Sequence, residues 1–170
     1  NGCRVEGSRI TEVRAPRGLL ECIQAAEYTR GFLAGRVALS RFRSLLIVSG
    51  AFGIFRKDLL VAIGGYRHTV GEDMDIVVRL HRHCIESGID YRVSFVPEPV
   101  CWTQVPKDLR SLLRQRNRWQ RGLADSLWAS RGMFLRRRYG AVGLFGFPYF
   151  AFVELLGPAI EFLGYVGFII

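Results

Sequence analysis

The sequence predicts an α/β fold followed by a helical segment at a membrane. Stretches with helical periodicity alternate with short apolar runs that are typical of strands. The 170 residues suffice for one modest domain. The segment 139–170 is strongly apolar, and its only charged residues are Glu154 and Glu161. We therefore divide the chain into a folded domain, 1–138, and a membrane segment, 139–170.

The elements of the first half can be predicted in order. Residues 1–17 are polar and rich in turn formers, which indicates short strands and turns. A helix is expected over 19–39, because apolar residues recur there at helical spacing. The short apolar run 45–48 fits a buried strand of an α/β sheet. A short helix over 56–63 follows and ends at a pair of glycines.

The second half is predicted to alternate in the same way. In the helix expected over 72–87, apolar residues form one sector, and Asp75 falls on the opposite side, where it needs only water. Gly88 is expected to cap this helix at its C-terminus. The run 91–96 is expected to be a strand, and 108–130 a long helix.

The apolar segment 139–170 is interrupted by Pro148 and Pro158. Neither piece reaches the ~20 unbroken residues of a simple spanning helix. An interfacial or kinked helix, followed by a spanning helix that is cut short, fits best. Glu154 and Glu161 are spaced to share one face of a helix. The alternative is a buried hairpin of a soluble protein.

Composition narrows the classes of partner. The net charge is +9, from 24 Lys and Arg against 15 Asp and Glu, and the basic residues gather largely between 107 and 138. Basic residues directly before an apolar segment are typical of the cytoplasmic side of a membrane. No nucleic-acid-binding motif is visible, so we expect no nucleic acid partner, although a basic nucleic-acid-binding domain stays an alternative. The four cysteines are scattered, which favours reduced thiols on a cytosolic face.

Asp73 is the sharpest candidate for chemistry. It stands with Glu72 at the expected start of a helix, where a carboxylate is favourable as a cap. A carboxylate held there is also suited to take a proton from an attacking hydroxyl. The pattern Asp73-x-Asp75 resembles a metal-binding pair, but residues two apart on a helix point away from each other, so we do not expect a metal there. The same reasoning makes His81 and His83 structural.

A second candidate group lies on the helix expected over 108–130. Gln115, Arg118 and Trp119 have the spacing i, i+3, i+4 and therefore share one helical face. A guanidinium suits a diphosphate, and an indole suits the apolar face of a sugar ring. The alternative is an amphipathic surface helix whose tryptophan packs on a neighbour or on lipid headgroups.

In this order, the motifs resemble the second half of a processive family-two glycosyltransferase, a family that includes synthases of cellulose, chitin, hyaluronan and poly-N-acetylglucosamine. The runs that carry the resemblance are LLIVSGAFGIFRKDLLVAIGGYRHTVGEDMDIVVRLHRH and YRVSFVPEPVCWTQVPKDLRSLLRQRNRWQRGL. The resemblance implies part of a GT-A domain, which is a Rossmann-like α/β fold for nucleotide-sugars. It also implies an inverting enzyme at the cytoplasmic face of a multi-pass membrane protein.

The resemblance assigns roles to particular residues. Glu72 and Asp73 match the acidic pair of a Thr-Glu-Asp triplet, which makes Asp73 the base, and Gly71 stands where the family has threonine. Arg118 and Trp119, with Gln115, match a QxxRW motif that lies near the donor diphosphate and the acceptor sugar.

The run Ser49-Gly50-Ala51-Phe52 resembles the loop that lines the acceptor pocket. The implied partners are a nucleotide-sugar donor, expected to be UDP-linked, a growing β-linked polysaccharide, the lipid bilayer and an accessory subunit. Mg²⁺ or Mn²⁺ would be held by a preceding half of the domain, since nothing in 1–44 resembles the metal-binding motif of the family. We therefore expect a part of a longer protein that is inactive by itself. The alternative is a catalytically inactive relative that acts as a membrane scaffold.

Overall fold

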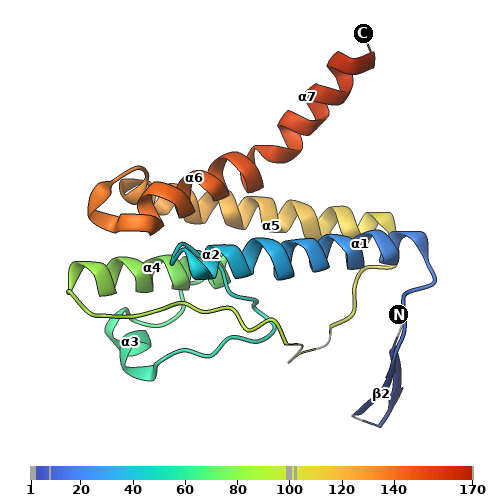
Figure 1. The fold of residues 1–170 in the computed structure, drawn as a ribbon, viewed down its shortest axis with the longest axis horizontal. Coiled ribbons are helices and arrows are strands. Elements are labelled where there is room, and N and C mark those ends of the chain that lie inside the picture. The colour runs from blue at the N-terminus through green and yellow to red at the C-terminus, as the bar shows by residue number, and fades with distance from the viewer. Residues whose placement is uncertain (1–2, 8, 99–100, 102, 170) are drawn as a thin grey trace.

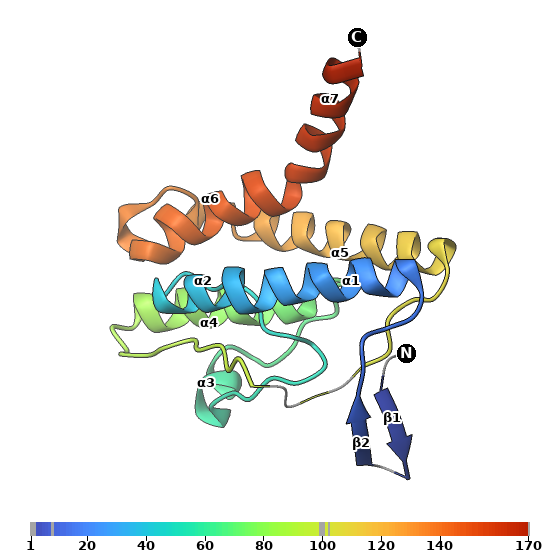
Figure 2. The same cartoon turned by 45° about the vertical axis from the view of Figure 1, so that its right-hand side comes forward.

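The computed structural model describes residues 3–7, 9–98, 101 and 103–169. Most of these residues are helical, and the long helices lie alongside one another while α7 projects away from the body (Figures 1 and 2). In chain order the elements are β1 (Cys3–Glu6), β2 (Arg9–Val13), α1 (Leu19–Thr29), η1 (Arg30–Arg36), α2 (Val37–Arg41), α3 (Lys57–Ala62), α4 (Glu72–Glu86), α5 (Leu109–Ala129), η2 (Arg131–Met133), η3 (Arg137–Tyr139), η4 (Val142–Gly146), α6 (Phe147–Tyr149), η5 (Phe150–Leu155) and α7 (Gly157–Ile169).

The predicted helices of the domain are all confirmed. The helix expected over 19–39 is one continuous rod formed by α1, η1 and α2, and its middle part, η1, has π-helical hydrogen bonding. At the start of α5, the Asp108 carboxylate accepts a hydrogen bond of 2.8 Å from the backbone N–H of Ser111, so it caps the helix.

The predicted glycine cap of α4 is also confirmed. Gly88 adopts the left-handed conformation with φ of +66°. The N–H of Ile89 donates to the carbonyl of Cys84 at 2.9 Å, and the N–H of Gly88 donates to the carbonyl of Ile85 at 3.3 Å. This pair of bonds is the Schellman arrangement, which satisfies carbonyls that the helix end leaves free.

The two predicted strands of the sheet are wrong. Within the described chain, the only sheet is the antiparallel hairpin of β1 and β2, which confirms the short strands expected near the N-terminus. Residues 45–48 and 91–96 do not form strands, and side chains bond three of their backbone groups. His81 Nε2 bonds the carbonyl of Leu45 at 2.8 Å. The Ser40 hydroxyl donates to the carbonyl of Val93 at 3.4 Å and accepts from Phe95 N–H at 3.0 Å.

The main core joins α4 and α5 to the first half of the apolar segment. Its buried members are Leu46, Met74, Val78, Leu127, Met133, Tyr139, Val142, Phe147 and Phe150. The part of the apolar segment before α7, including Phe150 of η5, therefore packs on the domain, as the alternative of a buried hairpin requires. The domain boundary at 138 stays a prediction.

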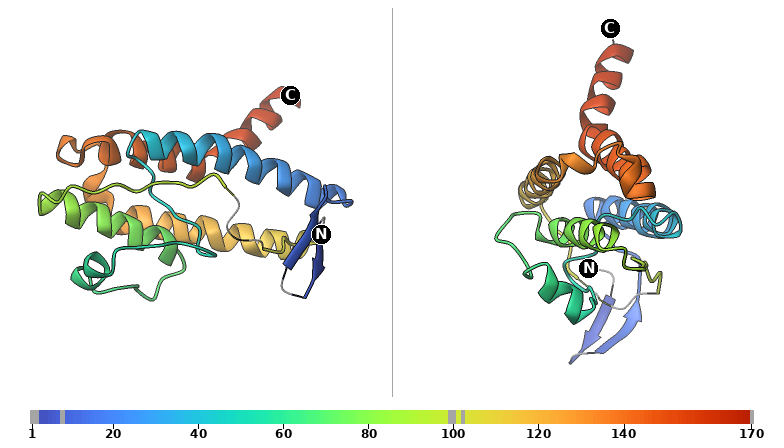
Figure 3. Two further views of the ribbon diagram at one scale, coloured as in Figure 1. Left: turned by 60° about the horizontal axis from the view of Figure 1, so that its bottom comes forward. Right: turned by 90° about the vertical axis from the view of Figure 1, so that its left-hand side faces the viewer.

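The second half of the apolar segment is different. Helix α7 leaves the body (Figure 3) and exposes large apolar side chains at Ile160, Phe162, Leu163, Tyr165 and Phe168. In the described part of the chain no single helix has the length and apolar character to cross a bilayer. By these two measures, one bent pair qualifies, Val142–Leu155 with Gly157–Phe168, whose halves meet at 45°.

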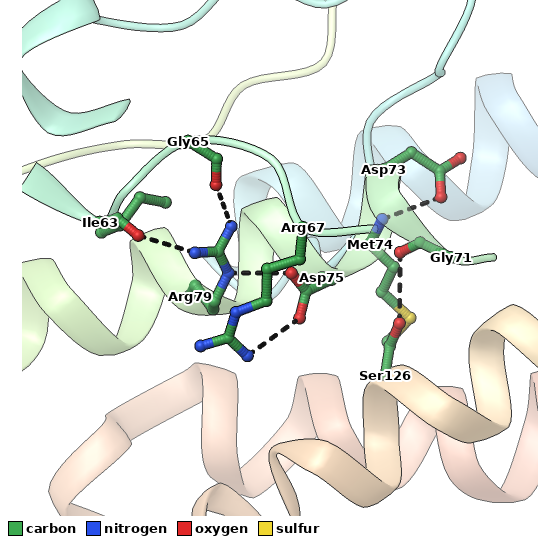
Figure 4. A network of polar contacts seen from close by, with 9 residues as sticks. All are labelled: Ile63, Gly65, Arg67, Gly71, Asp73, Met74, Asp75, Arg79 and Ser126. Atoms are coloured by element: carbon green, nitrogen blue, oxygen red, sulfur yellow. Dashed lines mark hydrogen bonds and ion pairs between the residues drawn. The ribbon is translucent and has the colours of Figure 1, made fainter. Parts of the chain in front are cut away.

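The expectation that Asp75 is solvated is wrong. Its carboxylate accepts a hydrogen bond of 2.9 Å from Arg79 Nε, and both side chains are about nine-tenths buried (Figure 4). Arg79 also donates to the carbonyl of Ile63 at 2.8 Å and to that of Gly65. The loop after α3 thus covers this face of α4. The periodicity of one helix does not predict that another segment of the chain packs on its polar side. The pair holds the loop that carries Tyr66 to the candidate site.

Candidate active site

A cavity of about 320 Å³ lies between the loop after residue 47 and the start of α4. Its lining contains the predicted acceptor loop and the predicted acidic pair together. The lining residues are Val48, Ser49, Gly50, Ala51, Phe52, Gly53, Phe55, Tyr66, Glu72 and Asp73. Segments that are distant in sequence therefore meet at one concave surface, as a binding site requires.

Asp73 lies in the first turn of α4. The N-cap position belongs to Gly71, which has no side chain to offer, and Asp73 Oδ1 instead accepts from the backbone N–H of Met74 at 2.9 Å (Figure 4). The acceptor loop packs against the same carboxylate, since a methyl group added at Gly50 would stand 3.7 Å from Asp73 Oδ2. Asp73 thus helps to cap the helix and also faces the cavity.

The surroundings of Asp73 raise the pKa of its carboxyl group above the ordinary value. Burial is the largest cause, and the negative charge of Glu72 adds to it. The hydrogen bond from Met74 N–H and the positive charge of Arg36 act in the opposite direction. A carboxylate whose pKa is raised is a stronger base than an exposed one, which suits proton abstraction from a hydroxyl group.

Two glycines bring α4 and α5 into backbone contact beside this cavity. A methyl group added at Gly71 would lie 2.5 Å from the carbonyl oxygen of Gly122 and 2.8 Å from Ser126 Oγ. The Ser126 hydroxyl donates to the carbonyl of Gly71 at 3.3 Å (Figure 4). No larger residue fits at either glycine without moving the helices.

The predicted group on α5 lies next to this contact but does not line the cavity. Trp119 precedes Gly122 by about one helical turn, and its ring lies against that of Tyr28 of α1. Its indole is 42% exposed, lies 6.3 Å from the ring of Tyr28 and has the Arg116 guanidinium 4.9 Å above it. Arg118 is exposed near the same turn.

Gln115, one turn before Trp119, has a buried Oε1 without a hydrogen-bond partner among the described residues. Such an acceptor is costly to bury alone. The ion pair of Arg116 with Glu27, with both N···O distances at 2.6 Å, fastens this part of α5 to α1. The three predicted residues of α5 thus lie on a part of the helix that is fastened to α1, and none of them lines the cavity.

Sequence reasoning placed Phe52 in the predicted acceptor loop but missed other residues of the cavity. Together with Phe52, the side chains of Phe55 and Tyr66 add aromatic walls to the cavity, and the rings of Phe55 and Tyr66 lie edge-on at 6.4 Å. The aromatic residues that follow the predicted acceptor loop in the sequence could have indicated this aromatic lining. Arg36, which acts on Asp73 from the first helical rod, gave no signal because only the fold brings it near.

Among the described residues, no group of three or more His, Cys, Asp or Glu side chains is placed to hold a metal ion. Asp73 faces the cavity while Asp75 is bound to Arg79, so the two carboxylates point apart (Figure 4). His81 is also structural: its ring bonds Leu45 and Tyr91, and burial lowers its pKa to about 4.

Comparison with known proteins identifies the family. The chain is similar to poly-beta-1,6-N-acetyl-D-glucosamine synthase of Staphylococcus epidermidis, with 28% identity over 111 residues, which are 65% of this chain and 26% of the relative. The enzyme of the same name from Staphylococcus aureus strain COL is 30% identical over 113 residues, with the same coverage. The chain thus spans about a quarter of these relatives. No solved structure shows a significant match. The family profile described as glycosyl transferase family group 2 matches residues 9–170, and the chain therefore belongs to this family of glycosyltransferases.

Proposed function

We propose that this chain supplies the base and the acceptor side of a membrane-bound, inverting glycosyltransferase that extends a β-linked polysaccharide. The observation that carries the proposal is the position of Asp73, a carboxylate with a raised pKa, in a cavity formed with the loop Ser49-Gly50-Ala51. Neither capping nor packing requires a desolvated carboxylate to face a cavity, whereas a general base must face its substrate.

In the proposed reaction, Asp73 removes the proton from an acceptor hydroxyl while the oxygen attacks the anomeric carbon of the donor. The bond between that carbon and the diphosphate breaks, and the nucleoside diphosphate leaves with the electron pair. Attack from the face opposite the leaving group inverts the configuration of the carbon. Glu72, the neighbouring carboxylate at the cavity, disfavours a second negative charge nearby and so keeps Asp73 basic.

The face of α5 supplies the remaining contacts of the proposal. Arg118 is exposed and carries a planar guanidinium, which suits the two oxygens of a departing diphosphate. The half-exposed indole of Trp119 offers a flat apolar surface to the acceptor sugar. The unpaired Oε1 of Gln115 accepts a hydrogen bond when a hydroxyl or amide group approaches this face.

Two features of the relatives and of the surface extend the proposal. The names of the relatives make UDP-N-acetylglucosamine the first donor to test. The exposed apolar side chains of α7, which follow a basic stretch, support insertion at the cytoplasmic face of a bilayer. An accessory subunit in the membrane stays part of the expectation. Mg²⁺ or Mn²⁺ would neutralise the diphosphate, and we expect a preceding half of the domain to hold the ion.

Turnover by the intact protein tests the proposal. The protein in lipid nanodiscs is given a short β-linked acceptor with UDP-N-acetylglucosamine, UDP-glucose or UDP-glucuronic acid, with Mg²⁺ or Mn²⁺. The expected result is transfer from one of these donors, with a β-linked product by nuclear magnetic resonance. An α-linked product contradicts inversion. Absence of transfer from every nucleotide-sugar, with the protein folded, contradicts the enzyme and favours the alternative of an inactive membrane scaffold.

A further inference from the structure

Tyr66 is an aromatic residue of the cavity to which the proposed reaction gives no part. Its side chain is more than half exposed and lines the cavity together with Asp73. Its ring stands edge-on against that of Phe55, with the ring centres 6.4 Å apart. Its hydroxyl has no hydrogen-bond partner among the described residues. An exposed ring with a free hydroxyl can contact a ligand with its apolar face and with its polar end.

The chain reaches Tyr66 through a tight turn at the end of α3. Gly64 and Gly65 both adopt the left-handed conformation, with φ of +77° and +69°, which residues with a side chain rarely take. The N–H of Gly65 donates to the carbonyl of Leu60 at 2.8 Å. The N–H of Gly64 donates to the carbonyl of Val61 at 3.0 Å. These bonds end α3 in the Schellman arrangement and direct the chain toward the cavity.

A buried charged pair on α4 holds the other side of this turn. The Arg79 guanidinium donates to the carbonyl of Ile63 at 2.8 Å and to that of Gly65, the residue directly before Tyr66 (Figure 4). The same guanidinium is bound to the Asp75 carboxylate at 2.9 Å, and both side chains are about nine-tenths buried. Because a planar guanidinium donates in fixed directions, these three bonds tie the backbone next to Tyr66 to α4.

The same helix carries the proposed base. Asp73 lies in the first turn of α4, and about 9 Å of helix separates it from Arg79. We propose that Tyr66 binds the terminal sugar ring of the acceptor, and that Arg79 is a positioning residue that sets the place of Tyr66 relative to Asp73. Arg79 does not line the cavity, so it acts through Tyr66 and does not touch the sugar. This inference rests on the proposed role of Asp73 as the base.

The competing explanation is a purely structural role of Arg79, since a broken buried pair destabilises the fold whether or not Tyr66 binds sugar. The two explanations differ in the coupling between the two residues. If Arg79 acts through Tyr66, the effect of Arg79→Lys on acceptor binding disappears when the tyrosine ring is removed. If its role is structural alone, Arg79→Lys has the same effect on binding with and without the ring.

The test measures the dissociation constant of a β-linked N-acetylglucosamine tetrasaccharide by calorimetry, together with the acceptor KM, for the intact protein in nanodiscs. Tyr66→Ala is expected to raise both by about tenfold, with the donor dissociation constant unchanged. Tyr66→Phe keeps the ring and is expected to raise them by only about threefold. Arg79→Lys keeps the charge beside Asp75 but loses the planar fork. We expect it to raise them by about fivefold in the wild type and by less than about twofold in Tyr66→Ala.

Matched controls and a second variant accompany these measurements. Phe42→Ala removes an exposed ring outside the cavity, and Arg56→Lys changes an arginine in an exposed ion pair. Neither is expected to change tetrasaccharide binding. If Arg79→Lys does not fold, the comparison is made with Gly65→Ala, which strains the backbone that Arg79 holds, while the added methyl group meets nothing within 4 Å.

Each outcome decides one level of the argument. Unchanged tetrasaccharide binding in Tyr66→Ala overturns the role of Tyr66, and an equal effect of Arg79→Lys in both backgrounds overturns the role of Arg79. Asp73→Asn tests the proposed function separately: if it retains turnover, the proposed base is wrong. An inactive Asp73→Asn with unchanged binding in Tyr66→Ala refutes only the present inference. A wild type that neither binds the tetrasaccharide nor transfers sugar to it refutes both.

Discussion

The contact between Gly71 and Gly122 makes a sharp prediction about how α5 positions the site. In Gly71→Ala, the added methyl group would lie 2.5 Å from the Gly122 carbonyl oxygen, whereas ordinary contact begins at 3.4 Å. The helices must therefore part by about 0.9 Å. The φ of Gly71 is −107°, which alanine also adopts, so the effect is steric alone. Overpacking of this kind costs about 1–3 kcal/mol.

The displacement also moves Asp73 relative to Trp119, and a shift of about 1 Å costs turnover roughly a hundredfold. Urea unfolding and sugar transfer by the intact protein are measured together. Gly31→Ala is the matched control, because a methyl group there meets nothing within 4 Å. Alanine in that exposed helical position is expected to stabilise the protein by about 0.5–1 kcal/mol without loss of transfer. Equal stability and full turnover in Gly71→Ala would refute the close helix contact.

Three further predictions concern buried charge and ring contacts. Asp75→Asn leaves the nine-tenths buried Arg79 without its carboxylate and is expected to cost about 3 kcal/mol of unfolding free energy, whereas Asp58→Asn, in an exposed pair, costs about nothing. Equal urea midpoints for these two variants would contradict the burial of the pair. The pKa of His81 is about 4 in the fold against 6.5 ordinarily, because the fold favours the neutral ring. The contribution of His81 to the free energy of unfolding is therefore complete above pH 6.5 and is lost as the pH falls toward 4. From pH 7 to pH 5 the loss is about 2 kcal/mol, and His81→Gln should remove this part of the slope; an unchanged slope would contradict a buried neutral ring. Trp119→Ala is expected to raise the acceptor KM with little change in donor affinity, and unchanged acceptor kinetics would exclude Trp119 from the acceptor site.

The helices were predictable from the sequence because their signals are local. Periodic apolar positions mark α4 and α5, and Gly88 and Asp108 cap them through bonds within a few residues. Strands are different, because a strand exists only beside a partner that the local pattern does not specify. The runs 45–48 and 91–96 have strand-like composition, yet their backbone groups bond to side chains of other elements.

The site was predictable where a motif lies within one short segment. The cavity brings Ser49, Gly50 and Ala51 together with Glu72 and Asp73, and the roles that the resemblance gives them stay predictions. The contributions of Arg36 and of the glycine pair depend on packing between distant elements, so no pattern within one segment reveals them. The buried state of Asp75 escaped prediction for the same reason: the loop that covers it belongs to another part of the chain.

The most direct test of the account is the effect of Asp73→Asn on the chemical step. Asparagine has nearly the same size and still accepts the Met74 N–H bond, but it does not take a proton. Single-turnover transfer in the intact enzyme is expected to fall by about 10²–10⁴-fold, with the donor dissociation constant unchanged. Asp58→Asn, at an exposed carboxylate, is expected to retain full transfer. Transfer by Asp73→Asn at a rate close to that of the wild type would contradict the central claim that Asp73 is the base.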